Sequence, residues 1–431
     1  MRKFKLKSEE INPQFIAGLR GNTDYTNVMV TIKTILEDVK ENGLTAVEKY
    51  ARKFDRVATN YELKQISKDA IAAAVANSSG ELKDAIIDAH KNIHKFHEMQ
   101  KAVEYEVETV PGVICGRKST PIESVGLYIP GGTAPLVSTL LMLAIPAKIE
   151  GCERIVMITP GNNGRIDDLL LFAADYCGID EIYPVGGAHG IAMLAYGAKG
   201  ITPVDKIFGP GNQYVTAAKM LISTDTEGCA IDMPAGPSEV LIIADDMANP
   251  AFVASDFLSQ LEHGNDSQAV LITNSDKFIS LFESELFKMY SKESRKGFIE
   301  KSLENSVVIK VENLNDAVKL SNIYAPEHLI INTKNEEELF DRIKNAGSVF
   351  IGGYSPESAG DYASGTNHSL PTSGYAKSYS GVSVEDFRKY ITYQKLTKSG
   401  LEQIATTIQK IAAFEGLEAH ANAIRIRLNE S

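Results

Sequence analysis

Short β-branched runs alternate with helical patterns along most of the chain. From Ser124 onward, the runs SVGLYI, RIVMIT, EIYPV and DKIF are each followed by a segment with apolar residues at helical spacing. A second set begins at EVLIIAD and continues through QAVLIT, SVVIKV, HLIINT and SVFIGG, with helical patterns at 252–263, 278–298 and 336–345. Repeated βα units predict parallel sheets covered by helices. The pattern therefore predicts two α/β domains.

The two ends of the chain differ from this middle part. Residues 37–100 have a mostly helical pattern, and a second helical segment begins at Gly400. The segment 352–381 is rich in glycine, serine and tyrosine and is too long for an ordinary connection. We expect it to be a binding loop.

Composition narrows the class of protein. The chain has 431 residues, of which 44% are hydrophobic and 23% charged, so it can form several globular domains. Its net charge of −12, without any basic stripe, argues against nucleic acid as a partner. The basic N-terminus is not followed by the apolar core of a secretion signal, and the longest apolar run contains a proline and is too short to span a bilayer. We expect a cytoplasmic protein with no membrane partner.

The four cysteines are widely scattered and include no C-x-x-C pair. This spacing is typical of reduced thiols and not of a disulfide framework or a cysteine-based zinc site. Any metal would therefore need nitrogen and oxygen ligands.

Three glycine-rich corners, YIPGGTAP, VGGAHG and FGPGNQ, follow predicted strands. In parallel sheets, ligands bind beyond the carboxyl ends of strands, where glycine lets the backbone approach and helix N-termini attract anions. None of the corners has the G-x-G-x-x-G pattern, and glycine in such turns often serves only a positive φ angle. Three corners in successive units favour a phosphate-bearing cofactor, but the pattern alone does not decide between these readings.

The segment SQLEHGNDSQ places a histidine in the last turn of a predicted helix. At 100° per residue, Gln260 and His263 are neighbours on one face, whereas Glu262 points elsewhere. Gly264 can then end the helix in the left-handed conformation. A histidine in the last turn often interacts only with the helix dipole, so the pattern leaves metal binding open.

Three other histidines lie within a few residues of a carboxylate, in turns or at the ends of elements. This clustering favours acid–base or metal chemistry. The pairs are Glu327 with His328, Asp361 with His368, and Glu415 with His420.

The spacing of His90, His94 and His97 places them on one helix face, which could chelate a metal. Lysines flank them, however, so we interpret this face as solvated or interfacial.

Seven segments occur in the order found in the histidinol dehydrogenase family, which the chain resembles nearly end to end. They are YIPGGTAPLVST, FGPGNQYVTAAK, IDMPAGPSEVLIIAD, LSQLEHGNDSQ, APEHL, ESAGDYASGTNHSLPT and EGLEAHA. The resemblance implies two incomplete Rossmann-like domains with mostly parallel sheets, one inserted in the other. The expected parts are an N-terminal arm (1–25), an α/β domain with the zinc and catalytic residues (26–129 and 239–381), an inserted domain with the NAD-binding loops (130–238), and a C-terminal helical dimerisation segment reaching the partner subunit of a homodimer (382–431).

The resemblance also implies a reaction. L-Histidinol would be oxidised by two NAD⁺, through bound L-histidinal, to L-histidine, in the last steps of histidine biosynthesis. His328 would act as general base, and Glu327 would activate water for attack on the aldehyde.

The implied binding residues fall into three sets. The zinc ligands would be Gln260, His263, Asp361 and His420, which also border the substrate together with Ser238, His368 and Glu415. The NAD contacts would be Tyr128, the residue at position 189, and Asn212. The family usually has glutamine where this chain has His189, although an imidazole can still donate a hydrogen bond.

Three alternatives remain open at this point. One is aldehyde oxidation through a thiol, with Cys115 or Cys152 as nucleophile. The second is a zinc-dependent hydrolase in which Glu327 activates a metal-bound water. The third is a non-catalytic paralogue that keeps the fold.

Overall fold

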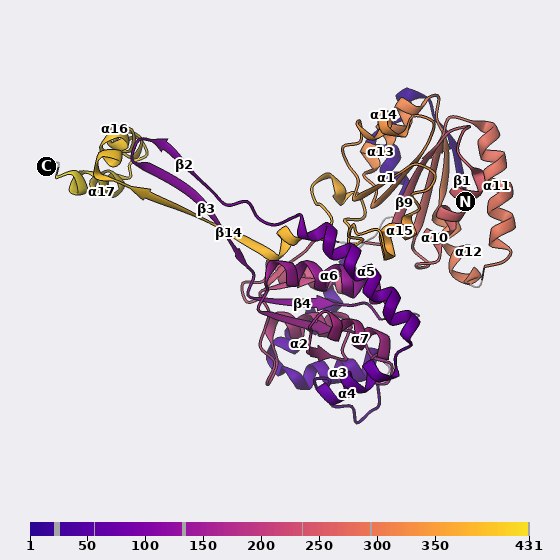
Figure 1. Ribbon diagram of the computed structural model, residues 1–431, viewed down its shortest axis with the longest axis horizontal. Coiled ribbons are helices and arrows are strands. Elements are labelled where there is room, and N and C mark those ends of the chain that lie inside the picture. The colour runs from indigo at the N-terminus through magenta and orange to yellow at the C-terminus, as the bar shows by residue number, and fades with distance from the viewer. Residues whose placement is uncertain (21–25, 56, 132–134, 235, 294, 430–431) are drawn as a thin grey trace.

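The computed structural model has two lobes and a projecting arm (Figure 1). It describes residues 1–20, 26–55, 57–131, 135–234, 236–293 and 295–429. Each lobe is built around a parallel sheet, which confirms the predicted α/β class with two Rossmann-like sheets. Within these ranges no helix is long and apolar enough to cross a membrane.

The first lobe contains a six-stranded sheet in the order β1-β11-β10-β9-β12-β13, in which every pair of neighbours is parallel. Strands β9, β10 and β12 are buried along their whole length, as expected of central strands covered on both faces. One face packs against α1, α13 and α14, and the other against α10, α11 and α12. The strands are β1 (Arg2–Lys5), β9 (Glu239–Ala244), β10 (Gln268–Thr273), β11 (Val307–Lys310), β12 (His328–Asn332) and β13 (Ser348–Ile351). The helices are α1 (Pro13–Leu19), α10 (Pro250–Leu261), α11 (Asp276–Tyr290), α12 (Lys296–Asn305), α13 (Leu314–Tyr324), α14 (Glu336–Phe340) and α15 (Glu357–Tyr362), with 3-10 turns η1 (Ser8–Glu10) and η2 (Tyr375–Lys377).

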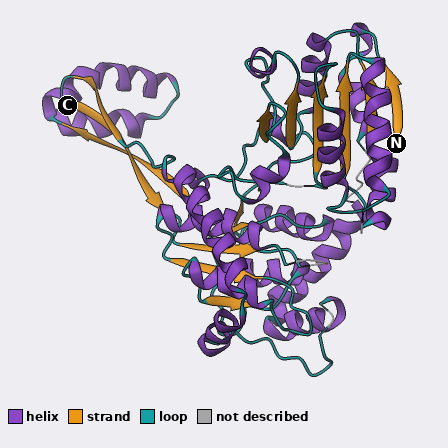
Figure 2. Ribbon diagram, turned by 45° about the vertical axis from the view of Figure 1, so that its right-hand side comes forward, coloured by secondary structure: helices purple, strands orange, loops and turns teal. Residues whose placement is uncertain are grey.

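The second lobe contains a five-stranded parallel sheet in the order β6-β5-β4-β7-β8 (Figure 2). Helices α4 to α7 pack against one face, and α2, α3, α8 and α9 against the other. The strands are β4 (Ser124–Tyr128), β5 (Arg154–Ile158), β6 (Glu181–Tyr183), β7 (Lys206–Phe208) and β8 (Ala230–Ile231). The helices are α2 (Thr26–Asn42), α3 (Leu44–Phe54), α4 (Lys68–Asn77), α5 (Gly80–Glu98), α6 (Val137–Glu150), α7 (Asp168–Tyr176), α8 (Gly187–Tyr196) and α9 (Gln213–Thr224).

The arm is a three-stranded antiparallel sheet that carries the C-terminal helices away from both lobes (Figure 1). Its order is β14-β3-β2, and it exposes large apolar side chains, including Phe414 at 93% and Ile426 at 73%. The sequence analysis did not predict this sheet. The elements are β2 (Tyr105–Val110), β3 (Val113–Pro121), β14 (Arg388–Leu396), α16 (Lys398–Phe414) and α17 (Glu418–Leu428), and η3 (Val384–Phe387) precedes β14.

The lobes divide the chain differently from the expected boundaries. Residues 2–5 form an edge strand, because β1 pairs with β11 in parallel, and are not part of an arm. Residues 26–98 belong to the second lobe, where α2 packs on α8 and α9, and α4 packs on α7. The second lobe is therefore inserted between β1 and β9 and begins near residue 26 instead of 130. Helical periodicity identifies an apolar face, but it does not say which sheet that face covers.

Three local features also differ from the sequence expectations. The expected helix 278–298 is two helices, α11 and α12. The sequence between them contains no proline or glycine that would predict the break, and the nearest glycine, Gly297, lies inside α12. Helix α10 ends at Leu261, so His263 follows the helix, and Gly264 is not in the left-handed conformation. The segment 352–381 is not wholly a loop, since it contains α15.

Candidate functional site

A cavity of about 950 Å³ is lined by residues from both lobes. The first lobe contributes the amino ends of its strands, because β9 begins at Glu239, β10 at Gln268 and β12 at His328. The second lobe contributes carboxyl ends, namely Tyr128 at the end of β4 and the corner at 210–212 after β7. The cavity therefore lies beyond the carboxyl ends of the strands in the second lobe only. In the first lobe, the candidate chemical groups precede the strands.

Glu327 is held in place immediately before β12. Its Oε2 accepts hydrogen bonds from Ser238 Oγ at 2.7 Å and from the backbone N–H of Glu239 at 2.8 Å. Burial raises the pKa of this carboxyl group to about 8. The carboxyl group is thus fixed by two donors while remaining at the cavity wall.

His328 is the first residue of β12 and is 3% exposed. Its Nδ1 lies 3.7 Å from Oε2 of Glu327 and 3.4 Å from Oε1 of Glu357, and its Nε2 lies 3.8 Å from Oδ1 of Asp361. Burial, with the repulsion of other imidazoles nearby, lowers the pKa of His328 to about 3. The ring is therefore neutral at neutral pH, the form that can accept a proton.

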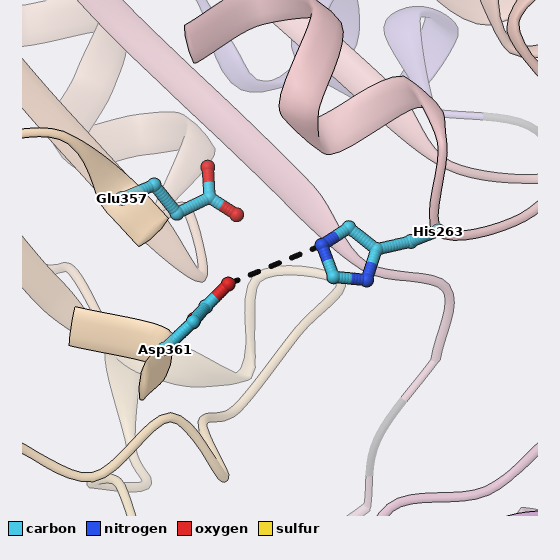
Figure 3. Close-up of side chains that lie close together, drawn as sticks. All are labelled: His263, Glu357 and Asp361. Atoms are coloured by element: carbon cyan, nitrogen blue, oxygen red, sulfur yellow. Dashed lines mark ion pairs between the residues drawn. The ribbon is translucent and has the colours of Figure 1, made fainter. Parts of the chain in front are cut away.

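Helix α15 directs two carboxyl groups toward the end of α10 (Figure 3). Glu357 and Asp361 are four residues apart on this helix, so they share a face. Nε2 of His263 lies 4.0 Å from Oδ2 of Asp361, and one ligand atom from each of the three side chains lies within 4.8 Å of the others. Burial raises the pKa of Asp361 to about 7. The carboxyl-terminal end of α10, with its partial negative charge, adds to a site suited to a cation.

Buried polar atoms without partners support a metal site here. Gln260 is fully buried, and neither atom of its side-chain amide has a hydrogen-bond partner among the described residues. The same holds for both carboxyl oxygens of Glu357. Buried polar groups are normally hydrogen-bonded, so side chains of this kind fit a set of metal ligands. The donor set of amide, imidazole and carboxylate suits zinc, manganese or cobalt.

Glu357 was not predicted as a site residue, because no histidine lies within a few residues of it in the sequence. The signal that could have identified it is the spacing to Asp361, which is one helical turn. Asp256 lies one turn before Gln260 on α10, and burial raises its pKa to about 7.

His368 connects the two lobes across the cavity. Its Nδ1 lies 2.9 Å from the backbone oxygen of Asp361, and its Nε2 lies 3.4 Å from Oγ1 of Thr139 on α6. Burial lowers the pKa of His368 to about 4. The ring can therefore present one nitrogen to a bound molecule as a neutral hydrogen-bonding group.

The second lobe supplies backbone corners and helix N-termini. Asn212 caps α9, its Oδ1 accepting from the N–H groups of Tyr214 and Val215. Gly209 has a φ of +127°, and a Cβ there would lie 2.1 Å from the backbone oxygen of Tyr128, so only glycine fits. The N-termini of α6 and α9 both face the cavity, an arrangement that favours phosphate groups.

His189 does not line the cavity, which corrects the expected contact with NAD. It is 1% exposed, and its Nε2 lies 3.0 Å from Oδ2 of Asp55. The same oxygen accepts from the backbone N–H of Gly186. Asp55, just after α3, thus gives the imidazole a buried partner that the sequence pattern did not reveal.

Glu415 and His420 lie on the arm, where both are exposed to solvent. Figure 1 shows α16 and α17 at the far end of the arm, away from the two lobes whose residues line the cavity. Within one chain, the structure therefore brings His263 close to Asp361 but leaves Glu415 and His420 on the arm.

Two further expectations change. His97 is fully buried, with Nδ1 lying 2.9 Å from the oxygen of Ile93 and Nε2 lying 3.3 Å from Nδ2 of Asn367, so at that position the helix face is interfacial and not solvated. Neither Cys115, on the arm strand β3, nor Cys152 lines the cavity. Burial, with the charge of Glu150, raises the pKa of Cys152 to about 12, which disfavours its use as a nucleophile.

Comparisons with known proteins show which proteins the chain resembles. A family model described as histidinol dehydrogenase matches residues 19–428. The chain is 49% identical over 430 residues to histidinol dehydrogenase of Bacteroides thetaiotaomicron, covering 100% of this chain and 99% of that protein, and 50% identical over 397 residues to that of Campylobacter jejuni, covering 92% of each. The crystal structure of histidinol dehydrogenase from Elizabethkingia anophelis superposes with a TM-score of 0.93 at 44% identity, covering 100% of this chain and 98% of that one.

Proposed function

Since the chain belongs to the histidinol dehydrogenase family, we propose that it oxidises L-histidinol to L-histidine with two molecules of NAD⁺ and one bound zinc ion, as a step of histidine biosynthesis. One observation carries the proposal. Glu327 and His328, a fixed carboxyl group and a neutral buried imidazole, face a wall of helix N-termini across a single cavity. This places acid–base groups opposite a site suited to a dinucleotide.

The base in both oxidations is His328. It takes the proton of the substrate hydroxyl in the first oxidation and that of the aldehyde hydrate in the second. Burial keeps the ring unprotonated at neutral pH, which is the form that a base requires. Glu327 takes a proton from the water that adds to the aldehyde, and the hydrogen bonds from Ser238 and Glu239 keep it oriented for that step.

The metal is held by Gln260, His263, Asp361 and, from a second chain, His420. The partnerless amide of Gln260 and the approach of His263 to Asp361 support the first three ligands. When bound, zinc supplies a positive charge that polarises the substrate and orients it. Ser238 and His368 lie at the cavity wall, where they can position the same substrate.

The cofactor lies against Tyr128 and the corner that ends at Asn212. Tyr128 lines the cavity at the end of β4, and the capped N-terminus of α9 favours the diphosphate. His189 supports this wall from behind through Asp55 and makes no direct contact with the cofactor.

A homodimer completes each site. Glu415 and His420 are exposed on an arm with large apolar side chains, and such surfaces mark protein interfaces. The arm of one chain thus brings Glu415 and His420 to the cavity of the other, where Glu415 can pair with the amine of the substrate.

The test is the yield of NADH per mole of L-histidinol, measured before and after removal of metal by a chelator. We expect two equivalents, lost on chelation and restored by zinc. One equivalent would mean that the aldehyde is released and that the role given to Glu327 is wrong. No NADH in the presence of zinc would overturn the proposal in favour of a zinc hydrolase or a non-catalytic paralogue.

A further inference from the structure

Glu357 is a buried carboxyl group beside the proposed base, and the proposed function gives it no role. Its side chain is 1% exposed, and neither oxygen has a hydrogen-bond partner among the described residues. Oε1 lies 3.4 Å from Nδ1 of His328. A group that accepts a hydrogen bond from one ring nitrogen of histidine determines which nitrogen carries the proton.

The competing carboxyl group near Nδ1 is already engaged. Oε2 of Glu327 lies 3.7 Å from Nδ1, but it accepts hydrogen bonds from Ser238 and from the backbone of Glu239. A carboxylate oxygen has two lone pairs in the carboxyl plane, and these two donors use them. Oε1 of Glu357 is both closer to the ring and free to accept.

The other ring nitrogen faces the metal side of the site. Nε2 of His328 lies 3.8 Å from Oδ1 of Asp361, whose other oxygen approaches His263. A proton held on Nδ1 leaves the lone pair of Nε2 directed toward this side, where the substrate hydroxyl would bind. That tautomer is the one that a base acting through Nε2 requires.

We propose that Glu357 is a positioning residue that accepts a hydrogen bond from Nδ1 of His328 and thereby keeps Nε2 free to act as the base. This inference rests on the proposed function, because it needs His328 to be the base. The role does not depend on the ionisation of Glu357, since even a protonated carboxyl group keeps one oxygen that can accept.

Two alternatives to this role of Glu357 make different predictions. Glu357 lies within 4.8 Å of His263 and Asp361 in the candidate metal cluster, so it could be a metal ligand instead. The backbone carbonyl of Glu239 also approaches the ring of His328 and could orient it without Glu357.

The experiment compares Glu357→Gln, which keeps an acceptor oxygen, with Glu357→Leu, which removes it. We expect Glu357→Leu to lower kcat by about tenfold to a hundredfold, with KM for both substrates and zinc content unchanged, and Glu357→Gln to retain most of kcat. Asp361→Asn is the matched control and should lose zinc. If Glu357→Leu does not fold, Glu357→Ala removes the same acceptor. Loss of zinc from any Glu357 variant, or an unchanged kcat on removal of the acceptor, overturns the proposal.

Two further readouts separate positioning from general structural support. In a His328→Gln background, adding Glu357→Leu should lower kcat no further, because the two residues act as a unit; an independent loss overturns the proposal. ¹⁵N NMR should find the proton of His328 on Nδ1 in the unaltered protein and distributed over both nitrogens in Glu357→Leu.

The failure of this inference can be distinguished from the failure of the proposed function. If the unaltered protein forms no NADH from L-histidinol, the proposed function fails. If it forms two equivalents and the kcat of Glu357→Leu equals that of the unaltered protein, only this inference fails.

Discussion

The first lobe meets the cavity with the amino ends of β9, β10 and β12, whereas the second lobe meets it with the carboxyl end of β4 and the corner after β7. The helices of the two lobes also meet the cavity with opposite ends. Helix α10 ends at the cavity, and α6 and α9 begin there. Because a helix carries partial negative charge at its carboxyl end and partial positive charge at its amino end, one wall favours a cation and the other favours phosphate. Two sheets of the same class thus provide complementary binding surfaces, because opposite ends of their strands face one space.

The difference extends to the kind of atom that each wall uses. The first lobe presents side chains such as those of Glu327, His328 and Asp361. The buried side chains of Gln260 and Glu357 in the same lobe have no hydrogen-bond partner among the described residues. The second lobe presents backbone groups shaped by glycine and by the cap at Asn212. Substitutions in the first wall should therefore change the chemistry, and substitutions in the second should change mainly the affinity for the cofactor.

The largest expected effect comes from Glu327→Gln in the first wall. Glutamine keeps the size of the side chain but cannot take a proton from water, so the second oxidation should slow by about 10²-fold to 10⁴-fold. The yield of NADH should fall from two equivalents to one, with release of the aldehyde, while KM for NAD⁺ stays unchanged. Rapid-quench analysis of the products checks this, and a retained yield of two equivalents would contradict it.

The pH dependence of the same step should also be large. The pKa of Glu327 is raised to about 8, so the carboxylate that accepts the proton becomes populated as pH rises. With L-histidinal as substrate, kcat/KM should increase with pH and level off at or below about 8, since a bound metal cation lowers the pKa from that value. Glu327→Gln should remove the rise, and an equal rise in that variant would assign it to another group.

In the second wall, Asn212→Ala should have an intermediate effect. It removes the acceptor of two backbone N–H groups at the start of α9, which should lower the free energy of unfolding by about 1 kcal/mol. The loosened helix N-terminus should raise KM for NAD⁺ by roughly fivefold to tenfold, because a loss of about 1.4 kcal/mol in binding free energy corresponds to a tenfold loss of affinity. KM for L-histidinol should stay the same, and Asn212→Ser, which can still cap, should restore most of the loss. If only KM for L-histidinol changed, the two walls would not have the separate roles described above.

The smallest effect on catalysis is expected from His189→Gln. The substitution breaks the buried contact with Asp55, so thermal unfolding should show a loss of about 1–3 kcal/mol in stability. KM for NAD⁺ should change by less than about twofold, since His189 does not line the cavity. A rise in KM as large as that of Asn212→Ala would restore His189 as a cofactor contact.

The sequence predicted the βα order well because each central strand is an unbroken apolar run, as in EVLIIA of β9. It did not place β1 beside β11, nor β14 beside β3, because those pairings join segments far apart in the chain. Strand β2 has almost no buried residue and therefore lacks the alternation that marks a half-buried strand.

Within the site, the motifs predicted which residues carry polar chemistry but not how they are distributed in space. His263 and Asp361 lie close together, whereas His189 contacts the carboxylate of Asp55, which follows α3 and lies more than a hundred residues earlier in the chain. Glu357 was missed because a carboxylate without a nearby histidine has no distinctive pattern. Its importance depends on burial and on the lack of a partner, which only the folded chain reveals.

The arm has a consequence for inheritance. If His420 of one chain completes the cavity of another, two defective gene copies, one with Glu327→Gln and one with His420→Ala, can rescue each other. In a mixed dimer, the chain with an intact cavity receives the intact arm of its partner, and random pairing would leave about a quarter of the sites complete. A cell carrying both copies would then grow without added histidine, although a cell carrying either copy alone would not.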